Sequence, residues 1–167
     1  MRLYLRQAAM IWAILGGIVV FTIVLVTTTN VGAFAIDRIA RHFDTTFPAL
    51  PGYEDFVRLS ISCAALMFFP YCQYMRGHVF VDILASRMSL KTQHLLDIIS
   101  LMTMVFLALF LSYWMILGML ETRADKAVSR VLGWQEWPFY IPGILSLLLW
   151  AMIATSQIFE PKRTAND

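Results

Sequence analysis

One histidine and one carboxylate stand at helical spacing between two apolar runs of the chain. Arg76, His78 and Asp82 occur in the sequence Arg-Gly-His-Val-Phe-Val-Asp. In a helix that begins by His78, the imidazole and the Asp82 carboxylate are one turn apart and can form a hydrogen bond. Histidine titrates near neutral pH, so a pH sensor or a metal ligand is conceivable. A single histidine with a single carboxylate is a poor metal site, and we therefore predict no metal centre here.

A second group of charges follows Pro51-Gly52. Glu54 and Asp55 follow this turn signal after one intervening tyrosine, and Arg58 follows Glu54 by four residues. Acidic residues are stabilised in the first turn of a helix by its macrodipole, so the pattern predicts a helix start. Glu54 and Arg58 can also pair on one helix face. The residues alone leave two interpretations open, which are an ordinary helix start with a surface pair and a docking point for another chain.

The usual signatures of catalysis are missing from the sequence. It contains no Gly-x-Ser-x-Gly, Cys-x-x-Cys, His-Glu-x-x-His or Walker sequence, which are the motifs of nucleophile, redox, zinc and nucleotide sites. Cys63 and Cys72 are nine residues apart, so a continuous helix places them on opposite faces, too far apart for a disulfide. We predict no catalytic residue, no cofactor and no metal, and we interpret both cysteines as small apolar packing residues.

The composition indicates that these residues are positioned by helices in a lipid bilayer. The chain has 167 residues, of which 59% are hydrophobic and 14% are charged, and its mean hydropathy is +0.69. Soluble domains are far less apolar. The net charge of +2 is small, and the basic residues are scattered among termini and loops. A nucleic-acid-binding protein needs a dense basic face, so nucleic acid is excluded as a partner.

Four apolar stretches have the length that a helix needs to cross a bilayer, about 20 residues. We predict spans at approximately 9–31, 55–75, 95–120 and 138–159. The corresponding uncharged runs are 7–36, 59–75, 98–120 and 137–159, and all charged side chains lie outside these runs. The first stretch follows Arg2 and Arg6 and resembles a secretory signal, but its apolar run is too long for a signal core. Pro70 predicts a kink near the end of the second span. Trp134, Trp137 and Tyr140 mark a membrane boundary at the start of the fourth.

Two further local patterns concern packing and the loop between the second and third spans. Ala13 and Gly17 are four residues apart and would form a notch of small residues that another backbone can approach closely. In the loop, apolar residues recur at helical spacing and Asp82 and Ser86 share a more polar flank, which predicts a short helix lying in the membrane interface. We therefore predict an all-α integral membrane protein, with four transmembrane helices plus this interfacial amphipathic helix, as one membrane domain over residues 1–167.

The order of the loop motifs along the chain is more specific than the apolar pattern. Gly52-x-Glu54-Asp55 opens the second span, Arg76-Gly77-His78-x-x-Val81-Asp82 follows it, and Trp137-Pro138 with Pro142-Gly143 opens the fourth. In this order the motifs, over nearly the whole chain, resemble the small membrane subunit, the DctQ type, of tripartite ATP-independent periplasmic (TRAP) transporters. Asp55 stands where that family more often has glutamate. The aspartate keeps the charge, but its side chain is shorter.

The resemblance implies a function for the chain. The expected role is a non-catalytic subunit that braces the scaffold of a large permease subunit, in a sodium-coupled transporter for organic acids of the dicarboxylate or sialic-acid type. The large permease subunit, a periplasmic substrate-binding protein and membrane lipids are the implied partners, and a contact with the binding protein stays open. Glu54, Asp55, Arg58, Arg76, His78 and Asp82 would then form an interface or a structural cluster.

The resemblance also implies a bacterial inner membrane with both termini in the cytoplasm. The charges do not decide this orientation, because seven of the 13 Lys and Arg lie on the side of the termini and six on the other.

Three other classes of membrane protein fit the sequence less well. A small quinone-linked oxidoreductase of four helices would need paired reactive thiols in its loops, whereas both cysteines lie within a span. A proton-coupled multidrug carrier would need a charged residue at membrane depth, and the uncharged runs 7–36, 59–75, 98–120 and 137–159 contain none. A cytochrome is disfavoured because the histidines at 42, 78 and 94 lie outside the spans. The transported substrate is not readable from this chain.

Overall fold

The computed structural model describes residues 2–43, 45–46, 50–75 and 89–159. Along the chain these form α1 (Arg2–Ala40), η1 (Arg41–Phe43), α2 (Tyr53–Met67), α3 (Phe69–Tyr74), α5 (Leu90–Ala124), η2 (Trp137–Phe139) and α6 (Tyr140–Ile158). In this described part, four helical stretches are long and apolar enough to cross a membrane. The predicted all-α class is confirmed. The predicted interfacial helix falls on residues 76–88, which lie outside the described residues.

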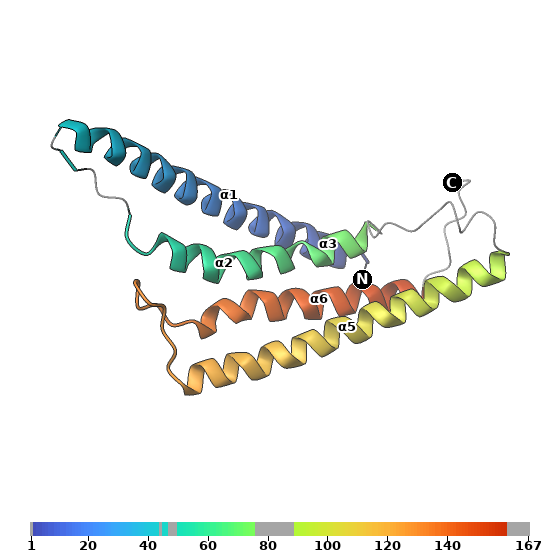
Figure 1. The fold of residues 1–167 in the computed structure, drawn as a ribbon. Helices are drawn as coiled ribbons and strands as arrows, with labels where there is room; N and C mark the ends of the chain where they lie inside the picture. Colours follow the sequence, from blue (N-terminus) through green and yellow to red (C-terminus); the bar gives the residue numbers. More distant parts are fainter. Residues whose placement is uncertain (1, 44, 47–49, 76–88, 160–167) are drawn as a thin grey trace.

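The helices are arranged as a row rather than as a closed bundle (Figure 1). α1 packs against α2 and α3, these two pack against α6, and α5 packs against the other side of α6. α6 is therefore the most enclosed helix, with 44% of its most apolar window buried within the chain, against 17% for α1 and 11% for α5. α1 begins and α6 ends at the same end of the molecule (Figure 1).

The second span is divided at Phe68, between α2 and α3. Pro70 lies in the first turn of α3 and cannot donate a backbone hydrogen bond to the preceding turn. At the break itself, the Phe68 N–H reaches the Ala65 carbonyl at 3.4 Å, three residues back rather than the four of a regular α-helix. The predicted kink near the end of this span is confirmed, and a six-residue helix follows it.

Small residues let the helices approach each other closely. On α1 the buried positions recur every seven residues, at Ala9, Gly16, Ile23 and Asn30. A Cβ atom on Gly16 would lie 2.9 Å from the Met67 Cβ, so α1 and α2 touch nearly backbone to backbone at this level. Between α5 and α6, small and large residues interdigitate around a core that contains Ala108, Leu147, Trp150 and Ala151.

Polar side chains join helices inside the apolar row. Trp12 Nε1 on α1 donates a hydrogen bond to Ser146 Oγ on α6 at 2.7 Å, and Ser146 Oγ donates in turn to the Pro142 carbonyl at 2.7 Å. Asn30, which is fully buried, accepts a hydrogen bond from the Leu50 N–H at 2.9 Å. The first of these contacts joins the outer helix α1 directly to the enclosed helix α6. The second holds the chain that leads into α2.

Candidate interaction site

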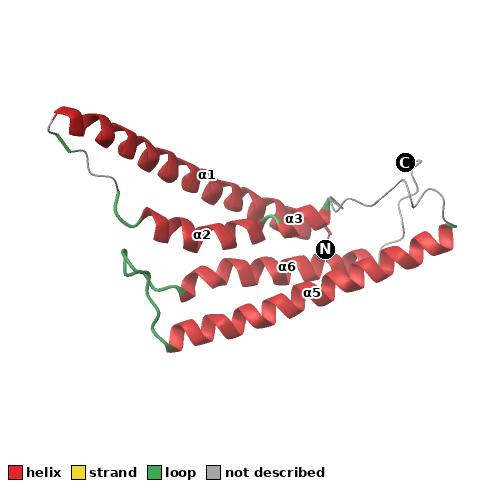
Figure 2. Ribbon diagram, viewed as in Figure 1, coloured by secondary structure: helices red, strands yellow, loops and turns green. Residues whose placement is uncertain are grey.

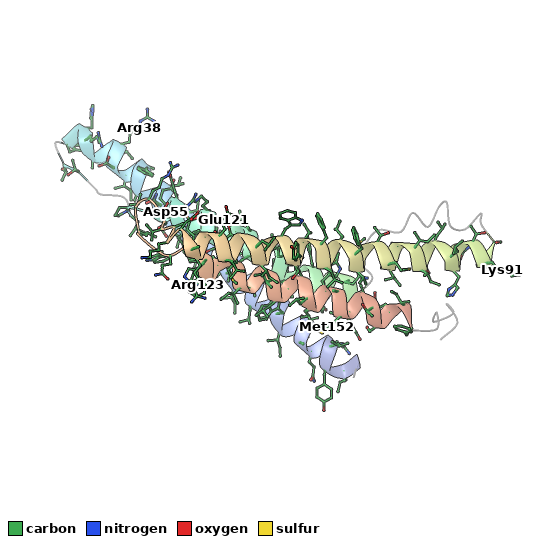
Figure 3. The ribbon with its side chains drawn as sticks, turned by 90° about the horizontal axis from the view of Figure 1, so that it is seen from below. Arg38, Asp55, Lys91, Glu121, Arg123 and Met152 are labelled. Carbon is green, nitrogen blue, oxygen red and sulfur yellow. The ribbon has the colours of Figure 1, made fainter. Side chains whose placement is uncertain are left out.

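The charges that open α2 lie at the end of the molecule opposite the start of α5. Figure 3 shows Asp55, Glu121 and Arg123 at one end of the molecule and Lys91 at the other. The loop of residues 125–136 between α5 and η2 lies at this same end, drawn among the loops in Figure 2. The loop and the first turn of α2 together define what we call the Asp55 clamp, which consists of Gly52, Asp55, Ser129, Val131 and Leu132.

Asp55 is the centre of the clamp. Its Oδ2 accepts hydrogen bonds from the Val131 N–H at 2.7 Å and from the Leu132 N–H at 3.1 Å. The Ser129 hydroxyl is a further hydrogen-bond partner of this carboxylate. Asp55 is 7% exposed and Ser129 is 2% exposed. Hydrogen bonds from backbone N–H groups to an ionised carboxylate are short and strong, so Asp55 fixes the loop to α2.

The loop has the shape of a narrow hairpin. The Ser129 N–H donates to the Trp134 carbonyl at 2.8 Å, and the Glu136 N–H donates to the Ala127 carbonyl at 3.2 Å. Ser129 Oγ also accepts from the Trp134 N–H at 3.1 Å. Gly133 closes the turn with φ of +65°, a backbone conformation that favours glycine. The loop is therefore internally bonded and meets α2 as a defined surface.

Gly52 allows the hairpin to lie this close to α2. Its φ is +80°, and a Cβ atom at this position would lie 2.7 Å from both Cγ and Cδ2 of Leu132. The Asp55 N–H donates back to the Gly52 carbonyl at 3.1 Å. Glycine is thus required twice, because of its backbone conformation and because of the space that Leu132 occupies.

A second layer of contacts surrounds the clamp. Arg58 forms an ion pair with Glu136 at the end of the hairpin. The Phe56 ring meets the Trp134 ring edge to face at 6.4 Å, and Trp134 stacks on Phe139 at 6.3 Å. The Arg123 guanidinium lies 5.1 Å from the centre of the Trp137 ring, a geometry that attracts a cation to the ring face. α2, the loop and the start of the fourth span are thereby joined at one end.

The structure places the predicted site residues as follows. Asp55 and Arg58 both contact the loop before the fourth span, while Glu54 is exposed at the surface. The sequence suggested Glu54 as the partner of Arg58; the structure gives Arg58 the carboxylate of Glu136, 78 residues away. Arg76, His78 and Asp82 lie outside the described residues, and their interface role stays a prediction.

The close approach between α1 and α2 does not involve the predicted notch of Ala13 and Gly17. A Cβ atom on Gly17 would have nothing within 4 Å in the described part of the structure, whereas one on Gly16 would meet Met67. Ala13 is partly exposed. The close approach of α2 therefore uses Gly16, and the Ala13–Gly17 notch stays a prediction for contact with another chain.

Sequence reasoning missed the partners of the site residues. Ser129 and Glu136 stand in a polar loop without any motif, so no local signal marks them. Gln73 and Gln157 are buried in α3 and α6 and bond to each other; two glutamines inside apolar spans were the available signal. Cys63 in α2 and Cys72 in α3 are both free thiols. Among the described residues, no three His, Cys, Asp or Glu side chains gather as a metal site.

The fold and its polar contacts define a multi-pass membrane protein with four helical spans, in which the loop before the fourth span is bound to the start of the second. The family model of the DctQ component of tripartite ATP-independent periplasmic transporters matches residues 30–164. The chain therefore belongs to the DctQ family, the small permease component of TRAP transporters. Members of this family work in tripartite complexes with a large permease and a substrate-binding protein. Comparisons with curated proteins and with solved structures gave no match.

Proposed function

We propose that this chain is the non-catalytic small permease subunit of a binding-protein-dependent, sodium-coupled transporter for organic acids, and that it braces the scaffold of the large permease subunit. Dicarboxylates and sialic acid are the substrate types we consider. The single observation that carries this proposal is the DctQ match over residues 30–164, which covers the Asp55 clamp and the loop with Arg76, His78 and Asp82.

The row of helices supports a bracing role. α1 and α5 stand at the outer edges and bury little of their apolar surface within the chain. On α5, large exposed side chains recur at spacings of three and four residues, namely Leu95, Ile99, Met102, Phe106, Leu109 and Tyr113. Such faces suit lipid or the helices of a larger membrane protein. The uncharged runs of the spans, residues 7–36, 59–75, 98–120 and 137–159, offer no charge at their centre for an ion pathway of their own, so we assign ion and substrate binding to the permease.

The Asp55 clamp supports the same role because a brace must be stiff. It holds the loop between α5 and α6 against α2 by two backbone hydrogen bonds to one carboxylate. The two helical hairpins, α1 with α2 and α5 with α6, are thereby fixed to each other at this end. We place this end at the outer face of a bacterial inner membrane, with both termini in the cytoplasm.

Reconstitution tests the proposal directly. The chain, the large permease and the binding protein are purified, and sodium-driven uptake of an organic acid into liposomes is measured with each component left out in turn. We expect uptake only when all three are present, and co-purification of this chain with the permease. Uptake by the isolated chain, with any ion gradient, would contradict the proposal.

The polar segment after the second span gives a residue-level test. Replacing Asp82 by alanine should weaken co-purification with the permease or abolish uptake, because the segment is proposed to face that subunit. Asp97→Ala, which changes the next carboxylate along the chain, on α5, serves as the comparison. Unchanged assembly and uptake in Asp82→Ala would remove this segment from the interface.

A further inference from the structure

A buried hydrogen-bond network joins α3 to the end of α6. Gln73 Nε2 donates to Gln157 Oε1 at 2.7 Å, and Trp150 Nε1 donates to Gln73 Oε1 at 3.0 Å. All three side chains are buried. A carboxamide in apolar surroundings is destabilising unless its polar atoms are bonded, so the pairing of two glutamines with a tryptophan depends on a specific relative position of α3 and α6.

The second glutamine also closes the end of α3. Gln157 Nε2 donates to the Gln73 carbonyl at 2.9 Å and approaches the Tyr74 carbonyl at 3.5 Å. The last carbonyls of any helix lack partners in their own helix. At membrane depth water is scarce, and such groups must find partners within the protein. A side chain from α6 therefore caps a helix that is 84 residues away in sequence.

The network stands directly before the polar segment of the chain. α3 ends at Tyr74 and Arg76 follows two residues later in sequence. We propose that Gln157, together with Gln73 and Trp150, is a positioning residue that fixes where the second span ends, and thereby where the chain enters the segment that assembly with the permease requires. The last step of this inference rests on the proposed function.

The competing explanation is that the glutamines only fill space between the helices. The two explanations differ in what an apolar side chain of the same length would do. Methionine has nearly the length of glutamine but cannot donate to carbonyl groups. Gln157→Met therefore keeps the packing and removes the cap, whereas a space-filling role would tolerate this change.

The test measures the position of the end of α3 directly. Spin labels are attached to cysteines at Met75 and Thr155, both exposed, in a chain whose Cys63 and Cys72 are replaced by alanine. We expect Gln157→Met to broaden the distance distribution between the labels. Each lost hydrogen bond should change the ratio of ordered to displaced chain about three-fold, the average for hydrogen bonds between membrane helices. The matched control is Gln7→Met, an exposed glutamine on α1, for which no change is expected.

A second measurement links position to assembly. Each variant is co-expressed with tagged permease, and the ratio of the two subunits after purification is determined. A broadened distribution with reduced co-purification supports the proposal. An unchanged distribution overturns it, and a broadened distribution with normal co-purification overturns its link to assembly. If the unaltered chain fails to co-purify, the proposed function fails, while the distance measurement still decides the positioning role.

A milder variant keeps the test decisive if Gln157→Met does not accumulate. Trp150→Phe removes the hydrogen bond to Gln73 Oε1 and part of the ring packed in the core, and it leaves the cap on α3 in place. We expect a smaller broadening of the same distance distribution. A distribution identical to that of the unaltered chain would show that the network does not set the end of α3.

Discussion

The carboxylate of Asp55 accepts the backbone N–H of Val131 at 2.7 Å, across 76 residues of sequence. The same oxygen atom accepts the Leu132 N–H. One side chain at the start of the second span thus determines the position of the loop before the fourth, and the rigidity of this end of the molecule depends on that contact.

Removing the Asp55 carboxylate should release the hairpin. In Asp55→Ala the N–H groups of Val131 and Leu132 lose their acceptor. The loop then opens more often, and the backbone after the exposed Arg130 becomes accessible to cleavage by trypsin. We expect cleavage after Arg130 to be several-fold faster in the purified chain, because proteolysis follows the population of the open form. Glu54→Ala, an exposed acidic residue of the same helical turn, is the control and should cleave at the original rate. Equal rates in both variants would contradict the clamp.

Alanine at Gly52 should destabilise the same end. A residue with a Cβ atom is strained at φ of +80°, and its Cβ would lie 2.7 Å from Leu132. We expect a loss of stability on the order of 1–3 kcal/mol, seen as a lower thermal midpoint in detergent. Gly17→Ala is the matched control, since the space around Gly17 is open. A midpoint for Gly52→Ala equal to that of the control would count against the strain argument.

The two adjacent glycines of α1 should respond differently to leucine. Gly16→Leu forces a large side chain against Met67, so α1 and α2 must separate and the isolated chain should melt earlier. Gly17→Leu should leave the isolated chain unchanged. If the Ala13–Gly17 notch receives the permease, Gly17→Leu should instead reduce co-purification of the two subunits. Normal co-purification would show that this notch faces lipid.

The hydrogen bond between Trp12 and Ser146 should contribute measurably to the packing of α1 on α6. A double-mutant cycle of Trp12→Phe and Ser146→Ala should give a coupling energy of about 0.6 kcal/mol, and at most about 1.7 kcal/mol. Unfolding in mixed micelles would measure it. The combination of Trp114→Phe with Ser146→Ala is the control, because Trp114 is exposed on α5 and should show no coupling.

The features that the sequence predicted correctly are those set by local chemistry. Four apolar runs of spanning length predict four helices because the bilayer fixes the length that a helix needs. Pro70 predicts the break in the second span because it lacks a backbone donor. Pro51-Gly52, followed closely by Glu54 and Asp55, predicts a helix whose first turn carries these two acidic residues. In the structure α2 begins at Tyr53.

The features that the sequence did not reveal depend on the relative rotation and position of distant helices. Arg58 has an acidic neighbour one turn away, yet it pairs with Glu136 because the hairpin brings that carboxylate to α2. Gly16 and Gly17 are chemically identical neighbours, and only the rotation of α1 decides which one faces Met67. The contact between Gln73 and Gln157 likewise requires α3 and α6 to be in register.

The arrangement of the helices side by side also determines how much bilayer this short chain occupies. Neighbouring helix axes are about 8–10 Å apart, so four helices in line extend for roughly 35–40 Å across the membrane plane, far more than the same helices would in a square. A protein of modest mass thus displaces a long strip of lipid. In the proposed role beside a large permease subunit, this breadth would resist tilting of the complex in the membrane.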